Sequence, residues 1–278
     1  MPEIHVHNSG EAGILANAYI VETERSLVAV DATLTVNEAR SFRERLIRLD
    51  KPLKAVLITH AHPDHVAGIT EWLLSKSTPI YAVRYVEQLM RATEQSKRAQ
   101  WEPVFKDQWI AHWTFPNRIV EDGNHIDVDD LRFRVLDIGA GGDCDANSVW
   151  IMEGEPARAF VGDLIFNGTH SYMADDHISD WLNNLRRIRS LLPKNALIYP
   201  GHGAPGNMEL FESQESYLRE YRQAIQAIAN GKSSLDESQK KELVERMKRF
   251  LSTESLAFMI ELSANAVAKE LANPAPQK

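Results

Sequence analysis

The stretch Thr59-His60-Ala61-His62-Pro63-Asp64-His65-Val66-Ala67-Gly68 places three histidines and one aspartate within residues 60 to 65. It directly follows residues 55 to 58, an apolar run that predicts a short buried strand. His60 and His62 share one side of the loop that leaves this strand, and Asp64 and His65 can turn toward a second point. Neutral imidazoles and carboxylates are ligands for divalent zinc, manganese or iron. The run therefore predicts a metal site, and a polar loop of solvated histidines is the alternative.

The chain around this run alternates between two hydrophobic periods. Runs rich in apolar and β-branched residues predict strands at 14–21, 27–32, 55–58, 80–83, 133–137, 148–152, 159–161 and 196–199. Apolar residues at helical spacing predict helices at 36–49, 66–74, 179–192 with Ser179 as N-cap, and 208–271 with an interruption near 231–234. Strands that alternate with helices predict an α/β layered fold, with helices packed outside the sheets.

Residues 84 to 125 give a less regular pattern. They predict a helix followed by an irregular aromatic segment, because Pro103 and Pro116 should break any long helix. The segment 101 to 115 holds Trp101, Trp109 and Trp113. These side chains either form an apolar wall over the metal site or belong to the ordinary core, and the sequence leaves both interpretations open.

Composition is that of a globular protein with no strong preference for nucleic acid. The chain has 278 residues, a hydrophobic fraction of 44% and a formal net charge of -8. The acidic balance argues against nucleic acid as a partner. Cys144 is the single cysteine, which fits a reducing compartment and predicts the cytoplasm. We expect no signal peptide and no transmembrane helix, so the predicted partner is a small-molecule substrate rather than a membrane.

Further motifs lie on both sides of the histidine run. They are Val30-Asp31-Ala32-Thr33 before it, and Phe160-Val161-Gly162-Asp163 and Tyr199-Pro200-Gly201-His202-Gly203 after it. Together with the opening strand 17 to 21, these pieces resemble the metallo-β-lactamase superfamily, whose signature HxHxDH stands at residues 60 to 65. The matching motifs run from about residue 14 to 206.

This resemblance implies an α/β (α+β) fold, the four-layer αββα sandwich of the metallo-β-lactamase type, with extra C-terminal helices. We expect the sandwich at 1–206, a helical extension packed on it at 207–272, and a disordered tail at 273–278. The resemblance also implies two divalent metal ions, with zinc as the first choice and manganese or iron as alternatives. Its roles are distributed as follows: His60 and His62 on the first ion, Asp64, His65 and His202 on the second, and Asp163 bridging both.

One position departs from the family pattern. The third histidine of the first metal is absent, and the corresponding stretch is Gly141-Gly142-Asp143-Cys144-Asp145-Ala146-Asn147. Anchoring on the strand at 148 to 152 puts Asp143 in the place of that histidine, as in superfamily branches with an acidic ligand there. Asp145 is the second candidate, and a vacant first site with a single metal is another alternative. Cys144 is expected to be a buried inert thiol rather than a ligand for a soft metal.

The implied reaction is hydrolysis by a metal-bridging hydroxide, with Asp64 orienting it and moving its proton. A small-molecule ester, lactone or thioester is the expected substrate, and a sulfate ester or phosphoester is the alternative. Phe166 stands where homoserine-lactone lactonases carry a tyrosine, which disfavours a lactonase. His170 and Tyr172 are candidates for substrate binding. A persulfide-dioxygenase-like oxidoreductase with one iron, and a non-catalytic binding protein, are alternatives from other classes.

The C-terminal region carries an apolar stripe at helical spacing. Its members are Leu210, Tyr217, Tyr221, Ile225 and Ile228. Such a stripe either packs on the sandwich or forms the surface of a homodimer. Sequence patterning predicts both arrangements equally.

Overall fold

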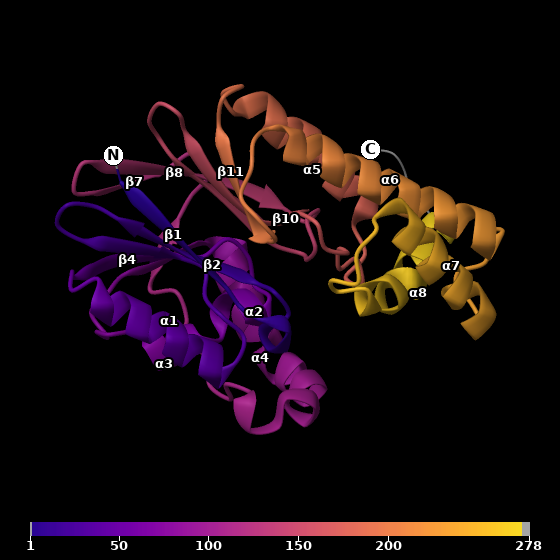
Figure 1. Ribbon diagram of the computed structural model, residues 1–278, viewed down its shortest axis with the longest axis horizontal. Helices are drawn as coiled ribbons and strands as arrows, with labels where there is room; N and C mark the ends of the chain where they lie inside the picture. Colours follow the sequence, from indigo (N-terminus) through magenta and orange to yellow (C-terminus); the bar gives the residue numbers. More distant parts are fainter. Residues whose placement is uncertain (1, 274–278) are drawn as a thin grey trace.

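The computed structural model describes residues 2–273 and consists of two β-sheets between layers of helices (Figure 1). Its strands are β1 (Glu3–Asn8), β2 (Asn17–Glu22), β3 (Leu27–Val30), β4 (Leu53–Leu57), β5 (Ile80–Val83), β6 (Arg118–Val120), β7 (His125–Val128), β8 (Leu131–Gly139), β9 (Asn147–Met152), β10 (Arg158–Phe166) and β11 (Leu197–His202). Its α-helices are α1 (Val36–Arg48), α2 (Pro63–Val66), α3 (Ile69–Trp72), α4 (Arg84–Phe105), α5 (Ile178–Leu191), α6 (Glu209–Ala229), α7 (Glu237–Phe250) and α8 (Phe258–Ala272). Two 3-10 turns, η1 (Glu11–Gly13) and η2 (Lys106–Gln108), complete the described elements.

The two sheets differ in strand direction. The first has the order β1-β2-β3-β4-β5-β6, antiparallel from β1 to β3 and parallel from β3 to β6. The second has the order β11-β10-β9-β8-β7, antiparallel from β7 to β10, with β11 parallel to β10. Helices α1 and α3 cover the outside of the first sheet, and α5 and α6 cover the outside of the second (Figure 1). The predicted αββα sandwich is therefore confirmed.

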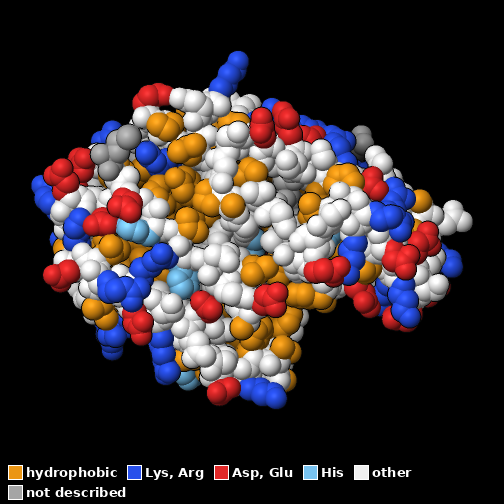
Figure 2. All heavy atoms as spheres, viewed as in Figure 1, with side chains coloured by type: hydrophobic (Ala, Val, Ile, Leu, Met, Phe, Trp, Pro, Cys, Tyr) orange, Lys and Arg blue, Asp and Glu red, His pale blue; other side chains and the backbone are white. Residues whose placement is uncertain are grey.

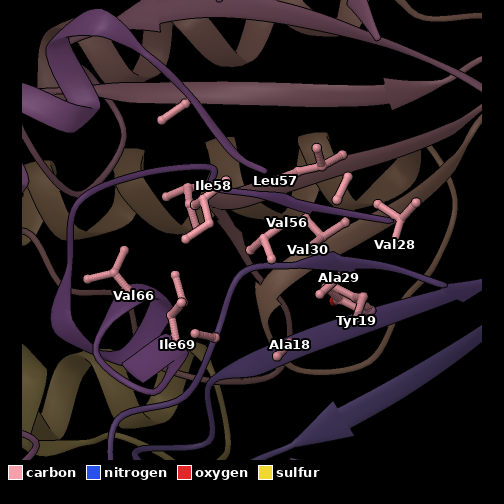
Figure 3. Close-up of a cluster of buried hydrophobic side chains, with 14 of the residues drawn as sticks. Ala18, Tyr19, Val28, Ala29, Val30, Val56, Leu57, Ile58, Val66 and Ile69 are labelled. Carbon is pink, nitrogen blue, oxygen red and sulfur yellow. The ribbon is translucent and has the colours of Figure 1, made fainter. Parts of the chain in front are cut away.

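Two apolar cores hold these layers together. Strand β9 alternates between them: Trp150 and Met152 face the first sheet, while Val149 and Ile151 face the C-terminal helices. Because both faces of the strand are covered, its sequence reads as one continuous apolar run. Figure 3 shows part of the first core, where side chains of β2, β3 and β4 converge.

Hydrogen bonds join the two sheets at the end of β4. The Trp150 indole donates to the Ile58 carbonyl at 2.9 Å, and the Ser148 amide donates to the Thr59 carbonyl at 2.7 Å. An isolated bridge pairs His60 with Asn147. The loop with the histidine run is thus fixed to the second sheet at both its backbone and its neighbouring side chains, which positions it for a site shared by the two sheets.

Three local expectations were wrong. Strands β1, β6 and β7 lie outside the predicted runs, because their apolar content is low and pairing with neighbours stabilises them. Helix α4 continues through Pro103 to Phe105. Pro103 lies in the last turn of α4, so it stands near the end of this helix and does not interrupt its middle.

The start of α5 also differs from the expectation. Ser179 is not its N-cap, since the helix begins at Ile178 and His177 precedes it. The carboxylate of Glu270, from α8, accepts from the amides of Ile178 and Ser179 at 2.9 and 3.1 Å. A distant acidic side chain thus satisfies the amides that a local cap would have bonded.

The C-terminal helices pack on the sandwich. Tyr217, Tyr221 and Ile225 of α6 are buried in the second core together with residues of α5, α7 and α8. The stripe is therefore covered within the chain, and the homodimer stays a prediction. Between residues 2 and 273, every helix falls short of the length and apolarity needed to cross a membrane. The predicted tail, from residue 274 on, lies outside the described residues.

Candidate metal centre

The predicted ligands come from five segments of the chain and converge at one edge of the sandwich. His60 and His62 lie in the loop after β4, and Asp64 and His65 lie on α2. The other three come from the second sheet and its loops. They are Asp143 between β8 and β9, Asp163 within β10, and His202 at the end of β11. All seven side chains are buried, with His62 the most exposed at 8%.

The first group of donor atoms joins His60, His62, Asp143 and Asp163, all within 4.8 Å of one another. His62 Nδ1 lies 2.5 Å from Asp143 Oδ2. His60 Nε2 lies 3.7 Å from Asp143 Oδ1 and 3.8 Å from Asp163 Oδ2. Two imidazole nitrogens and two carboxylates at these separations can surround one divalent ion. We call this group the first half-site.

The second group joins Asp64, His65, Asp163 and His202 within the same limit. His65 Nε2 lies 3.2 Å from both Asp64 Oδ2 and Asp163 Oδ1. His202 Nε2 lies 3.4 Å from Asp64 Oδ2 and 3.2 Å from Asp163 Oδ2. Asp163 belongs to both groups, which is the arrangement that a bridging carboxylate requires. We call this group the second half-site.

Unsatisfied polar atoms test whether metal ions fit here. His60 Nε2, His65 Nε2, Asp143 Oδ1 and Asp163 Oδ1 are buried and have no hydrogen-bond partner among the described residues. Leaving such atoms unpaired costs about 1–3 kcal/mol each. All four point into the two half-sites, so cations held between them would satisfy every one. The donor set therefore fits divalent ions.

The electrostatics of the cluster favour cations as well. Burial lowers the pKa of His62, but Asp143 and Asp175 outweigh it and raise the pKa to about 10. Burial also lowers the pKa of His202, and Asp163 and Asp64 outweigh it and raise the pKa to about 9. Both shifts report a strongly negative potential at the buried imidazoles, which is the potential that a divalent cation would occupy.

Asp31 supports the second half-site from within the first core. Its carboxylate accepts from the Thr59 amide at 2.8 Å and from the Thr59 hydroxyl at 2.7 Å. The same carboxylate lies 3.2 Å from His65 Nδ1, so it fixes the ring whose Nε2 faces the ligand group. Thr59 Oγ1 also lies 2.9 Å from His60 Nδ1. The sequence singled out the turn that contains Asp31 but assigned no role to it.

Asp175 supports the first half-site, a role that the sequence analysis did not assign. Its Oδ2 atom lies 3.0 Å from His62 Nε2, the nitrogen opposite the ligand group. Tyr172 donates its hydroxyl proton to Asp175 Oδ1 at 2.8 Å, and Lys97 Nζ lies 3.8 Å from Oδ2. The Tyr172 ring packs edge-on against His62. An acidic residue close to the candidate Tyr172 was the available signal.

The neighbours of Asp143 have other partners. Asp145, the second candidate ligand, is 63% exposed at its side chain and bonds His177 Nε2 at 2.6 Å. Burial raises the pKa of the Cys144 thiol well above its usual value, which favours an inert thiol. The structure therefore brings Asp143, and not Asp145, to the first half-site.

The two candidate substrate-binding residues lie in different environments: one lines a cavity and the other does not. Tyr172 lines the cavity next to the metal ligands. His170 is fully buried, with Nδ1 2.9 Å from the Tyr217 hydroxyl and Nε2 3.2 Å from the Thr253 carbonyl. It is not among the residues that line the cavity, so the structure does not bring it to the site, and its role in substrate binding stays a prediction. Phe166, the residue in the lactonase tyrosine position, stacks flat on His202 at 4.7 Å.

The glycine before His202 is required by close packing. A Cβ atom on Gly201 would collide with Asp163 Oδ1. Only a residue without a side chain lets the end of β11 run so close to the shared carboxylate. The motif Pro200-Gly201-His202 thereby sets the distance between His202 and Asp163.

A cavity of about 350 Å³ opens beside the ligands. His62, Asp64, Asp143, Asp163 and His202 form its floor. The sequence left open whether the aromatic segment 101 to 115 forms a wall of the site or part of the core, and the structure shows both. Trp101 and Phe105 line the cavity, whereas Trp109 and Trp113 are buried core residues.

A family model described as the metallo-beta-lactamase superfamily matches residues 13–202. The chain belongs to this superfamily. The matched region contains every candidate metal ligand and excludes α6, α7 and α8. The chain spans 63%, 61% and 64% of the first three curated relatives it matches.

Individual superfamily members are distant. A protein named hydroxyacylglutathione hydrolase from Prochlorococcus marinus (strain MIT 9312) is 25% identical over 184 residues, covering 66% of this chain and 63% of that protein. A protein named atrochrysone carboxyl ACP thioesterase, from Aspergillus novofumigatus, is 27% identical over 217 residues, covering 76% of this chain and 57% of that protein. The solved metallo-beta-lactamase from Pontibacter korlensis superposes with a TM-score of 0.59 at 19% identity, covering 73% of this chain and 87% of that one, which shows a shared fold.

Proposed function

We propose that this protein is a metal-dependent hydrolase of a small-molecule thioester, with esters and lactones as chemically related candidates. The observation that carries the proposal is the pair of buried donor groups that share Asp163 and form the floor of a cavity. Similarity to a protein named as a thioesterase, and to others named as hydroxyacylglutathione hydrolases, supports a thioester.

The ligand sets favour two divalent ions, zinc first, with manganese or iron as alternatives because three carboxylates supply hard oxygen donors. His60, His62 and Asp143 would hold one ion, Asp64, His65 and His202 the other, and Asp163 both. When bound, such ions acidify a water molecule and polarise the carbonyl of the substrate.

The residues of the chain supply positioning and proton transfer. Asp64 lines the cavity and lies beside His202, so its carboxylate can accept a proton from the water that attacks the carbonyl carbon. The carbon–sulfur bond then breaks, and the proton passes to the leaving sulfur. The products are a free thiol and a carboxylic acid, and the acid loses its proton at neutral pH to become a carboxylate. Tyr172 also lines the cavity, and its hydroxyl proton is already donated to Asp175.

A substrate panel on protein of measured metal content tests this proposal. The panel contains thioesters, esters, lactones, sulfate esters and phosphodiesters. We expect thioester cleavage by protein with two ions per chain, and a loss on the order of 10³-fold in His62→Ala. Preferred cleavage of a sulfate ester or phosphodiester would contradict the substrate class. One iron per chain with oxygen consumption would contradict hydrolysis.

The cytoplasmic location remains a prediction from the single cysteine.

A further inference from the structure

The cavity has two chemically different ends. Its floor is the polar ligand group, and its outer walls are apolar side chains from two helices that face each other. These walls are formed by Trp101, Val104 and Phe105 of α4 and by Phe258, Met259 and Leu262 of α8. Figure 2 shows hydrophobic side chains on the lobe that contains α4 and at the notch between this lobe and the C-terminal helices.

The apolar walls extend to the surface. Val104 is 62% exposed, Phe258 51% and Leu262 41%, and all three are large hydrophobic residues. Large apolar side chains that gather on both sides of an opening indicate a surface that is covered when a ligand binds. Since this opening is continuous with the metal ligands, the ligand that covers it is the substrate.

Charge in the cavity argues against a polar, multiply charged acyl or peptide group. Apart from the predicted metal ligands, Lys97 is the one charged residue among those lining the cavity. Its ammonium group lies 3.8 Å from Asp175 and over the Tyr172 ring, and its side chain is only 14% exposed. A substrate with several ionised groups, such as a glutathione conjugate, would therefore find no free cation among the lining residues to compensate its carboxylates.

We infer, on the basis of the proposed thioester hydrolysis, that the acyl group of the substrate is a straight alkyl chain that lies between α4 and α8. The carbonyl end meets the ligand group at the floor, and the methyl end reaches the exposed residues at the mouth. Helix α8 lies outside the region matched by the superfamily model, so half of this alkyl pocket is an addition that belongs to the C-terminal extension.

Acyl-chain length is the variable that tests this inference. N-acetylcysteamine thioesters from acetyl to dodecanoyl keep the thiol constant, and S-lactoylglutathione supplies the polar comparison. Assays stay below the critical micelle concentration. For the metal-loaded protein we expect kcat/KM to rise about fourfold per methylene until the pocket is filled, because each buried methylene contributes about 0.8 kcal/mol. Equal kcat/KM for all chain lengths, or a preference for S-lactoylglutathione, would overturn the inference while leaving thioester hydrolysis intact.

Two matched leucine variants assign the effect to the pocket. Leu262 on α8 and Leu191 on α5 are exposed to 41% and 46%, and only Leu262 lines the cavity. We expect Leu262→Gln to lower the decanoyl-to-acetyl ratio of kcat/KM by roughly tenfold. Leu191→Gln keeps the ratio of the unmodified protein. Equal decanoyl-to-acetyl ratios in both variants would show that α8 does not contact the alkyl chain.

A binding measurement separates failure of the inference from failure of the proposed function. S-alkyl thioethers of N-acetylcysteamine resemble the thioesters but cannot be hydrolysed, and calorimetry measures their binding directly. Affinity that rises with alkyl length, without hydrolysis of any thioester, would support the alkyl pocket and refute thioesterase activity. Affinity that does not depend on length would refute the pocket whatever the activity.

Discussion

The two half-sites share Asp163 but are supported by different parts of the molecule. In the second half-site, His65 and His202 are 0% and 1% exposed, and Asp31, which accepts a hydrogen bond from the Thr59 hydroxyl, lies 3.2 Å from His65 Nδ1. In the first half-site, Asp143 lies in a loop, and His62 is held by Asp175, whose side chain is 29% exposed. The comparison shows that His65 is held by a buried carboxylate, whereas His62 is held by a partly exposed one.

The largest effect is expected from the carboxylate that both half-sites use. Asp163→Asn keeps the shape of the side chain but removes the negative charge that would hold both proposed ions. We expect metal content to fall below one ion per chain and hydrolysis to fall on the order of 10³-fold. Elemental analysis and the thioester assay measure the two quantities. An unchanged metal content would exclude Asp163 as the shared ligand.

Removal of Asp143 should affect only the first half-site. In Asp143→Ala we expect one ion per chain instead of two and a loss of hydrolysis of roughly 10²-fold. Asp145→Ala is the matched control, since Asp145 is two residues away, exposed, and paired with His177. The control should retain both ions. Equal metal loss in the two variants would contradict the assignment of Asp143.

Removal of Asp31 should mainly change the stability of the protein, whereas removal of Asp175 should mainly change its affinity for the first ion. Asp31→Ala leaves the buried Thr59 amide and hydroxyl without their partner. We therefore expect the free energy of unfolding to fall by about 3 kcal/mol. Asp175→Ala should leave stability almost unchanged and weaken binding of the first ion by about 10–100-fold. Denaturant unfolding of the metal-free proteins and competition with a chelator measure these effects. Similar unfolding curves for both variants would contradict the view that Asp31 contributes to stability and Asp175 does not.

The smallest effect concerns the loop that carries Asp175. Burial lowers the pKa of His170, which holds this loop to Tyr217 and to the Thr253 carbonyl. The unfolded chain therefore binds a proton below pH 6.5 more readily than the folded protein does. The contribution of neutral His170 to stability is complete above pH 6.5 and is lost as the pH falls below it. Melting temperatures from pH 7.5 down to pH 5 should decrease less in His170→Gln, and parallel curves would contradict the role of His170.

Sequence patterning predicted the parts of the site that lie in local motifs. The run from His60 to His65 carries candidate ligands close together in the chain, and Asp163 and His202 were assigned from motifs that resemble those of the superfamily. Asp143 was placed from its distance to the following strand. The roles assigned to Asp143, Asp163 and His202 therefore depended on the resemblance to the metallo-β-lactamase superfamily, and local order alone indicated a metal site only at residues 60 to 65.

The supporting residues could not be predicted because their contacts join distant segments. Asp175 meets His62 across 113 residues, and Glu270 meets the start of α5 across 92. The side of the pocket formed by α8 depends in the same way on how the C-terminal helices dock. Hydrophobic periodicity shows that these helices have a buried face, but not which residues remain at the opening of a cavity.

Anomalous diffraction at the zinc edge from crystals of the zinc-loaded protein tests the central claim directly. The account predicts two peaks about 3.5–4 Å apart. One should be bound by His60, His62 and Asp143, the other by Asp64, His65 and His202, with Asp163 between them. A single peak, or a first peak that Asp143 does not contact, would contradict a two-metal centre with an acidic third ligand.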